Sequence, residues 1–172
     1  RPLAAPRDLV MVPKTEVIGH LSPVLGIYWD AALNPLALAI GDTNKTLNAV
    51  GARLQITPLL GIGLFDWVEL SMAVPFVAWQ TSDNLRSIGT EGTIKQTPGL
   101  GDIRLSSKVA IPYFNRKDEV KSGFGLAVMG NINLPTGDEL AFTSDGALAG
   151  GVSLIADYRF NFGLLVASNL GV

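Results

Sequence analysis

The stretch LGDIRLSSKVAIPY (Leu100–Tyr113) decides the fold class, because its polarity alternates with a period of two residues. Alternate positions form an apolar series, Ile103, Leu105, Ser107, Val109 and Ile111. The positions between them form a polar series, Asp102, Arg104, Ser106 and Lys108. Successive side chains of a strand point to opposite faces, whereas a helix would mix the two series. The stretch therefore predicts a β-strand with one apolar and one polar face.

The same alternation recurs along most of the chain. Candidate strands lie at residues 20–30, 36–40, 53–64, 68–79, 100–113, 122–134, 147–160 and 162–172. Most of them exceed the roughly 5–6 residues of a strand in a globular protein and reach the roughly 9–11 that a membrane-spanning strand needs. Long alternating segments separated by turns are the sequence signature of outer-membrane barrels. We predict an all-β fold, an antiparallel transmembrane β-barrel with about eight strands in this chain, as part of a larger barrel.

Composition excludes several other classes of protein. The chain has 172 residues, of which 48% are hydrophobic and 16% charged, and its formal net charge is −2. High hydrophobicity argues against disorder, and the absence of a basic field argues against nucleic-acid binding. With no cysteine and one histidine, His20, a thiolate metal site or a Ser-His-Asp triad has no basis. We predict no enzymatic activity, no catalytic residue, no cofactor and no bound metal.

The sequence offers no candidate for a transmembrane helix. The longest stretch without a charged residue is Ser122–Gly137, which contains two asparagines and a proline. A spanning helix needs about 20 predominantly apolar residues. Because Arg1 begins no basic segment that leads into an apolar core, we also expect the chain to be processed or trimmed at its start. We assign residues 1–18 to an N-terminal extended segment and residues 19–172 to the barrel.

The two faces of the strands are assigned to two environments. We predict that the charged residues of the polar face point into the lumen: Asp30, Arg53, Glu69, Asp102, Arg104, Lys108, Asp157 and Arg159. Their acidic and basic members balance, which favours a salt-bridged plug over a pore lining, although a selective pore remains the alternative. We predict that lipid contacts the apolar face at Leu70, Val74, Phe76, Ile103, Leu105, Val109, Leu126, Val128 and Leu154.

Connections and prolines complete the expected topology. Tight links are expected at residues 31–34, 65–66 and 160–161, and long ones at 80–99 and 135–146. Prolines cannot donate to a strand ladder, so we expect Pro23, Pro58 and Pro75 at bulges or strand ends.

The number of strands raises a difficulty. If both chain ends lie on the periplasmic side, either Asp8–Ile18 is an additional strand or Leu36–Ile40 is not a separate one. The final strand, Gly163–Val172, would lack a partner, and an unpaired edge is not tolerated in lipid. We therefore expect further C-terminal strands or another subunit to close the barrel.

Several phrases, in order along nearly the whole chain, carry a resemblance to a known family. They are GHLSPVLGIYWDAALNPLAL (Gly19–Leu38), LLGIGLFDWVELSMAVPFV (Leu59–Val77), GLGDIRLSSKVAI (Gly99–Ile111), GFGLAVMGNINLPTGD (Gly123–Asp138) and DYRFNFGLLVASNLG (Asp157–Gly171). They resemble the N-terminal β-barrel of OmpA-family outer-membrane proteins and, more loosely, the meta-pathway phenol-degradation outer-membrane family. The resemblance implies a barrel that is followed by periplasmic repeats and a peptidoglycan-binding domain. The repeats and the peptidoglycan-binding domain are not in this sequence.

These observations favour a non-enzymatic protein of the cell outer membrane with a structural or anchoring role and lipid as its main partner. The first alternative is a small porin or channel for hydrophobic or small solutes. The second is a soluble β-sandwich or lipocalin-like binding module, in which the apolar face would form the core.

The long links predict the orientation of the chain. We expect Leu85–Thr97 and Glu139–Asp145 to face the cell exterior, since outer-membrane barrels have short periplasmic turns and long outer loops. Protease added to intact cells should cut within these two segments. Cleavage at Asn115–Glu119 instead would invert the orientation.

Overall fold

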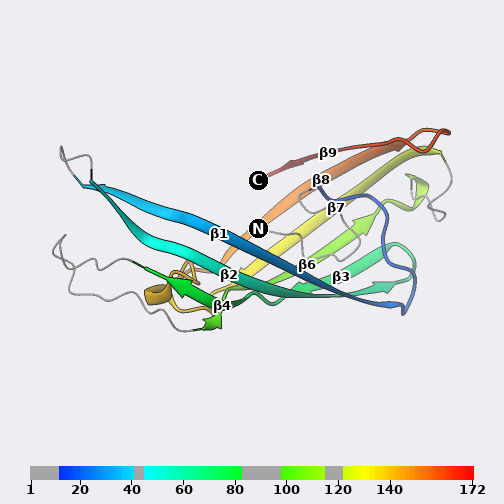
Figure 1. The fold of residues 1–172 in the computed structure, drawn as a ribbon. Helices are drawn as coiled ribbons and strands as arrows, with labels where there is room; N and C mark the ends of the chain where they lie inside the picture. The colour runs from blue at the N-terminus through cyan, green and yellow to red at the C-terminus, as the bar shows by residue number, and fades with distance from the viewer. Residues whose placement is uncertain (1–11, 41–44, 83–97, 115–121) are drawn as a thin grey trace.

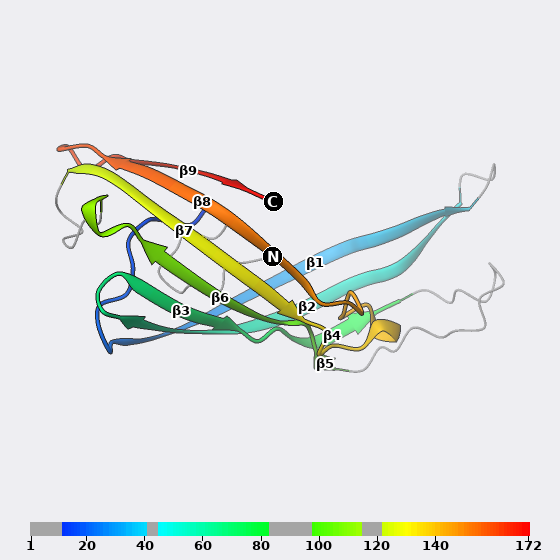
Figure 2. The ribbon, with the colours of Figure 1, turned by 180° about the vertical axis from the view of Figure 1, so that it is seen from behind.

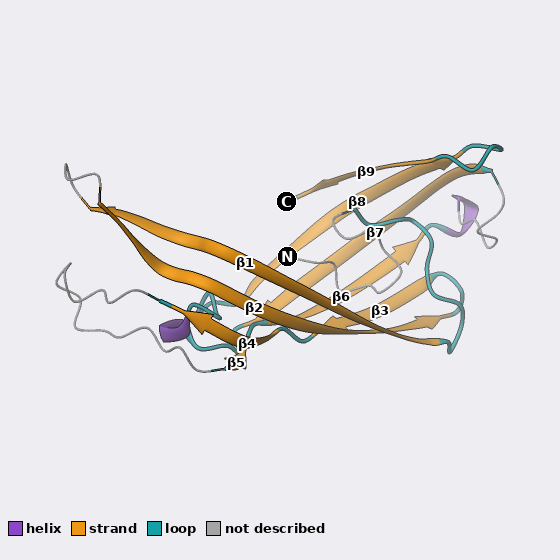
Figure 3. Cartoon of the chain, viewed as in Figure 1, coloured by secondary structure: helices purple, strands orange, loops and turns teal. Residues whose placement is uncertain are grey.

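The computed structural model describes residues 12–40, 45–82, 98–114 and 122–172. Within them the chain forms one antiparallel sheet of nine strands and no α-helix (Figures 1 and 3). The strands are β1 (Pro23–Ile40), β2 (Lys45–Leu64), β3 (Val68–Ala73), β4 (Phe76–Thr81), β5 (Gly99–Leu100), β6 (Ile103–Ala110), β7 (Gly123–Leu134), β8 (Ala149–Arg159) and β9 (Leu165–Gly171). Two 3₁₀ turns, η3 (Pro112–Phe114) and η4 (Glu139–Ala141), follow β6 and β7.

The sheet is open. β1 pairs with β2, β2 pairs with β3 and β4, and the order continues through β6, β7 and β8 to β9. β1 and β9 therefore lie at opposite edges, and the sheet is not closed into a barrel (Figure 2). The prediction of an all-β antiparallel architecture is confirmed.

The first strand corrects two expectations. β1 runs without a turn through residues 31–34, so the tight link expected there does not exist and Leu36–Ile40 is not a separate strand. The pairing with β2 instead shifts register between Leu33 and Leu36, where Asn34 has a φ of 49°. An irregularity of this kind absorbs Pro35, which has no N–H for the ladder. Of the two alternatives for the strand number, the structure has the second, because Leu36–Ile40 is part of β1, and the described part of Asp8–Ile18, residues 12–18, forms no strand.

Two of the expected strands are divided, one of them at a proline. The predicted strand 68–79 is split at Val74–Pro75 into β3 and β4, and 100–113 is split at Gly101–Asp102 into β5 and β6. Pro58 lies where β2 changes partner from β3 to β4, and Pro23 is the first residue of β1. These are the bulge and strand-end positions expected of prolines.

A bulge in β4 corrects one face assignment. The strict alternation placed Trp79 on the polar face together with Val77. Leu54 pairs with Trp79 whereas Gln55 pairs with Val77, so the pairing skips one residue. The bulge turns Trp79 outward, where it is exposed, and leaves Val77 buried.

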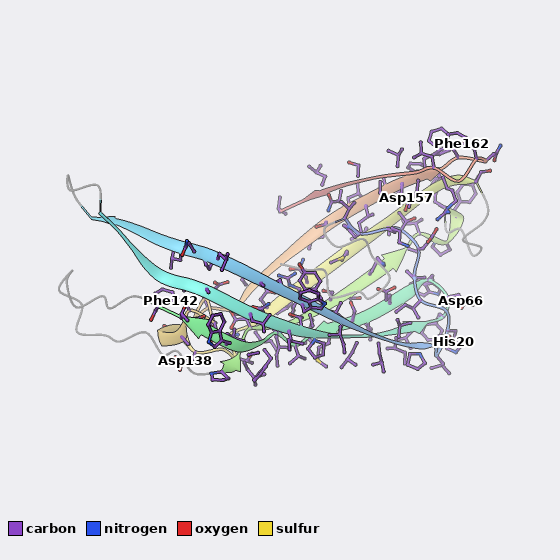
Figure 4. All side chains as sticks on the ribbon, in the orientation of Figure 1. His20, Asp66, Asp138, Phe142, Asp157 and Phe162 are labelled. Carbon is purple, nitrogen blue, oxygen red and sulfur yellow. The ribbon has the colours of Figure 1, made fainter. Side chains whose placement is uncertain are left out.

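The sheet has two distinct faces and two distinct ends. The inner face is the one along which residues 12–18 run, and the outer face is its opposite. Residues 65–67 and 160–164 connect strands at what we call the turn end, and residues 135–148 connect β7 to β8 at the loop end. Figure 4 shows His20, Asp66 and Phe162 at the turn end, and Asp138 and Phe142 toward the loop end.

A small hydrophobic core lies on the inner face. Ala110, Ala127, Met129 and Ile155 are buried together, and Val17 from the N-terminal segment packs on them. The small side chains leave room for the segment against β6, β7 and β8. Among the described residues, no helix has the length and hydropathy to cross a membrane.

Adjacent residues of β7 provide a test of the two faces. Ala127 is fully buried on the inner face, whereas Val128 is 40% exposed on the outer face. Ala127→Leu should lower the free energy of unfolding by about 1–3 kcal/mol, because extra methylenes do not fit a filled site. Val128→Leu should change it by less than about 0.5 kcal/mol. Urea unfolding measures both, and equal effects would contradict the assignment of faces.

Candidate functional site

The charged inner face is the candidate site. All eight charged residues predicted for the interior lie there: Asp30, Arg53, Glu69, Asp102, Arg104, Lys108, Asp157 and Arg159. Of the nine predicted lipid contacts, eight lie in strands with their side chains on the outer face, and Val74 lies in the break between β3 and β4. The inner charges divide into a group at the turn end and a group toward the loop end.

The turn-end group contains a buried ion pair. Glu69 of β3 and Lys108 of β6 are cross-strand partners, and their Oε1 and Nζ atoms are 3.5 Å apart. Their side chains are only 1% and 2% exposed. A charge buried this deeply requires a partner, so the β3–β6 register is fixed by electrostatics as well as by the backbone ladder.

The N-terminal segment completes this group. We call residues Val12–His20 the strap. The backbone N–H of Ile18 donates to Glu69 Oε2 at 3.0 Å. The backbone N–H and the hydroxyl of Thr15 donate to the two carboxylate oxygens of Asp157 at 2.8 and 2.9 Å. Two carboxylates of the sheet thus satisfy backbone and side-chain donors of the strap, which has no ladder at these positions.

Further contacts hold the middle and the C-terminal end of the strap. Arg159 Nη2 lies 3.3 Å from Glu16 Oε1. At the turn end, the N–H of His20 donates to Asp66 Oδ1 at 2.8 Å, and His20 Nδ1 accepts the N–H of Phe65 at 3.0 Å. The strap therefore crosses the inner face from β8 to the β2–β3 turn, as the dark blue segment of Figure 1 shows.

Two glycines make the strap's path possible. A Cβ atom added to Gly63 of β2 would overlap the carbonyl oxygen of Ile18, and one added to Gly125 of β7 would overlap the hydroxyl of Thr15. Both glycines occupy inner-face positions of their strands. The inner face therefore has a groove fitted to the strap's backbone.

Residues 135–146 cover the loop end of the inner face. Asp102 accepts the backbone N–H groups of Gly137 and Asp145 at 3.2 and 2.9 Å, one on each carboxylate oxygen. Arg53 donates to the carbonyl oxygen of Phe142 at 3.0 Å, and Gln80 donates to that of Ala141 at 2.9 Å. Side chains from β2, from β4 and from the link between β5 and β6 thus hold residues 135–146 against the sheet. The other long connection that was predicted to face outward, Leu85–Thr97, lies outside the described residues.

A cavity of about 310 Å³, lined by polar and apolar side chains, lies next to Phe142 and Thr143. Its polar lining includes Asp30, Arg53, Thr57, Arg104 and Thr143, and its apolar lining includes Ala73, Pro75 and Phe142. The Arg104 Nε–H donates to Asn133 Oδ1 at 2.9 Å, which orients the guanidinium along the sheet. Charged side chains of both signs lie beside apolar ones, so the cavity suits water and small solutes that carry polar groups.

The sequence indicated the charged inner face but not the strap. Thr15, Glu16 and Ile18 carry no pattern that marks them as partners of Asp157, Arg159 and Glu69. The signal that the sequence does contain is the excess of Gly and Ala among the polar positions, which is typical of a crowded interior. Among the described residues, no group of three or more His, Asp or Glu side chains is arranged to hold a metal ion.

No protein-family model, curated protein or solved structure matches this chain. The resemblance to the OmpA family therefore stays a prediction from the sequence phrases alone.

The buried ion pair gives a testable consequence. Glu69→Ala should lower the free energy of unfolding by about 3–5 kcal/mol, because Lys108 would remain buried without its carboxylate. The double variant Glu69→Leu/Lys108→Met should recover part of that loss, since apolar replacements of similar volume remove both charges. Urea unfolding of the two variants measures the difference. A double variant as unstable as Glu69→Ala would contradict this account.

Proposed function

We propose that this chain is a non-enzymatic structural protein of the cell outer membrane, in which the sheet forms the wall of a transmembrane β-barrel. Lipid covers the outer face, and the strap and the charged residues fill the inner face. In this proposal the loop end faces the exterior and the turn end faces the periplasm.

The polarity of the two faces is the observation that carries the proposal. The outer face presents large apolar side chains on strand after strand, including Leu25 at 77% and Leu33 at 83% exposure in β1, whereas the inner face buries Glu69, Lys108 and Asp157. A water-soluble monomer rarely exposes a contiguous apolar surface larger than a few hundred Å². Outer-membrane barrels have the same distribution, with an apolar band that faces lipid and polar residues that face the lumen.

Aromatic side chains at the turn end support the same environment. Exposed rings gather where the strands end there, at Phe65, Trp67, Tyr113, Phe124, Tyr158, Phe160 and Phe162. Several contact one another, as in the Phe65–Trp67 pair with ring centroids 6.2 Å apart and the Tyr158–Phe160 pair at 4.8 Å. Girdles of aromatic residues mark the membrane–water interfaces of outer-membrane barrels.

Closure of the barrel needs an additional strand. β1 and β9 both run from the turn end to the loop end. The chain reverses direction with each pass between them, and these passes are β2, β3 with β4, β5 with β6, β7, and β8. Direct pairing of β1 with β9 would therefore be parallel. An antiparallel barrel with no open edge in lipid requires at least one strand running the other way between them, from further sequence or from another subunit.

The cavity of about 310 Å³ favours one alternative, a channel for small solutes. The strap argues against an open channel at rest, because it lies across the inner face and is hydrogen-bonded to Asp157 and Glu69 there. The soluble-module alternative requires another layer over the outer face.

Three single substitutions to arginine test the proposal. Leu105→Arg and Leu126→Arg should impair membrane insertion, since an arginine at the bilayer midplane of a barrel costs about 2–4 kcal/mol. Ser106→Arg, the matched control on the inner face of β6, should be better tolerated. Co-flotation with phospholipid vesicles measures insertion, and a gel shift between unheated and boiled samples measures closure of the barrel.

Two outcomes would overturn the proposal. Equal damage from Leu105→Arg and Ser106→Arg would mean that both faces are buried in protein. A wild-type chain that stays monomeric without detergent and unfolds cooperatively in urea would place the apolar face in a soluble core.

A further inference from the structure

We infer that the strap is a displaceable plug and that its withdrawal opens a polar passage for small hydrated solutes along the inner face. This inference rests on the proposed function, because a passage requires the sheet to be part of a closed barrel. It adds solute conduction, controlled by the N-terminal segment, to a protein proposed to be structural.

The strap differs from the strands in how it is held. β7 and β8 are joined by a continuous ladder from Gly123–Arg159 to Asn133–Ala149. The strap is fastened by side chains, with Asp157 on Thr15, Glu69 on Ile18 and Arg159 on Glu16. Each of these partners is a charged group that water can also solvate. The strap can therefore leave at the cost of one isolated bridge, His20–Gly63, whereas each strand would lose a whole ladder.

The surface beneath the strap carries charged groups beside the small apolar cluster of Ala110, Ala127, Met129 and Ile155. Glu69 keeps Lys108 as its counter-ion, 3.5 Å away, and Asp157 and Arg159 lie two residues apart on the same face of β8. Gly63 and Gly125 leave a groove where the strap ran. Water can occupy the charged part of this surface because its polar groups offer hydrogen bonds.

This groove leads toward the cavity near the loop end. Thr57 and Ala73 line the cavity and share the inner face with Glu69 on the neighbouring strands β2 and β3. Residues 135–146 keep their own anchors, Asp102, Arg53 and Gln80, and so still narrow the exit. The passage is therefore narrow, with side chains of both charge signs beside the apolar Leu59–Ala73 cluster, and it suits small ions and polar molecules with little preference for one sign of charge.

Glycine substitutions test the inference in samples whose gel shift between unheated and boiled protein shows a closed barrel. Gly63→Val and Gly125→Val each place atoms where the strap runs, whereas Gly130→Val is a matched control in β7 with no atom within 4 Å of its Cβ position. In phospholipid vesicles loaded with KCl, we expect potassium efflux through the first two variants to exceed that of wild type by about tenfold or more, because water replaces the plug. Gly130→Val should behave as wild type.

A disulfide provides a reversible version of the test. The Cβ position of residue 125 lies 3.0 Å from Thr15 Cβ. A shift of roughly 0.5–1 Å gives the Cβ separation of a disulfide. The chain has no cysteine of its own, so Thr15→Cys/Gly125→Cys introduces a single pair of thiols. The disulfide of the oxidised form should hold the strap in place and block potassium efflux. Reduction of the disulfide should restore potassium efflux.

Insertion, measured by co-flotation of the same samples, separates the possible failures. If the variants insert like wild type and efflux is unchanged, or if oxidation has no effect, the plug inference is wrong and the proposed function stands. If wild type does not insert, the proposed function fails and the inference fails with it.

Discussion

The buried pair of Lys108 and Glu69 is the interaction on which the inner face depends. A lysine with 2% exposure is tolerated only beside a carboxylate, and that carboxylate also accepts the N–H of Ile18. One acidic side chain therefore ties together β3, β6 and the strap. The register of the central strands and the position of the N-terminal segment follow from the same electrostatic requirement.

A second consequence concerns what surrounds the sheet. Charge is satisfied on the inner face by cross-strand partners, by the strap and by residues 135–146, so this face needs little water. The outer face has no comparable cover within the described residues and consists of aliphatic side chains between aromatic ones. An apolar solvent on that side removes the cost of exposing it, which is the physical support for the membrane proposal.

Wherever a strand is regular, the sequence predicted correctly on which face of the sheet each side chain lies. In β6 the alternation assigned Leu105 and Lys108 to opposite faces, and the structure has them there. Prediction failed where the backbone departs from strict alternation. The bulge in β4 moves Trp79 to the outer face, and the irregularity at Asn34–Pro35 joins two expected strands into β1. A bulge inserts one residue and inverts the face of all that follow, and single residues do not reveal its position.

The sequence by itself determined the strand period, the separation of apolar from charged side chains, and the strand ends marked by prolines, because these depend on local geometry. Only the tertiary structure decided where the strap lies. Thr15 and Asp157 are 142 positions apart, and Ile18 and Glu69 are 51 apart. They meet because the strand order and register bring the two carboxylates onto one face, beside glycines that leave room for a backbone. Such contacts depend on pairing between distant strands, and the alternation of polarity within one segment does not show which strand it pairs with or in which register.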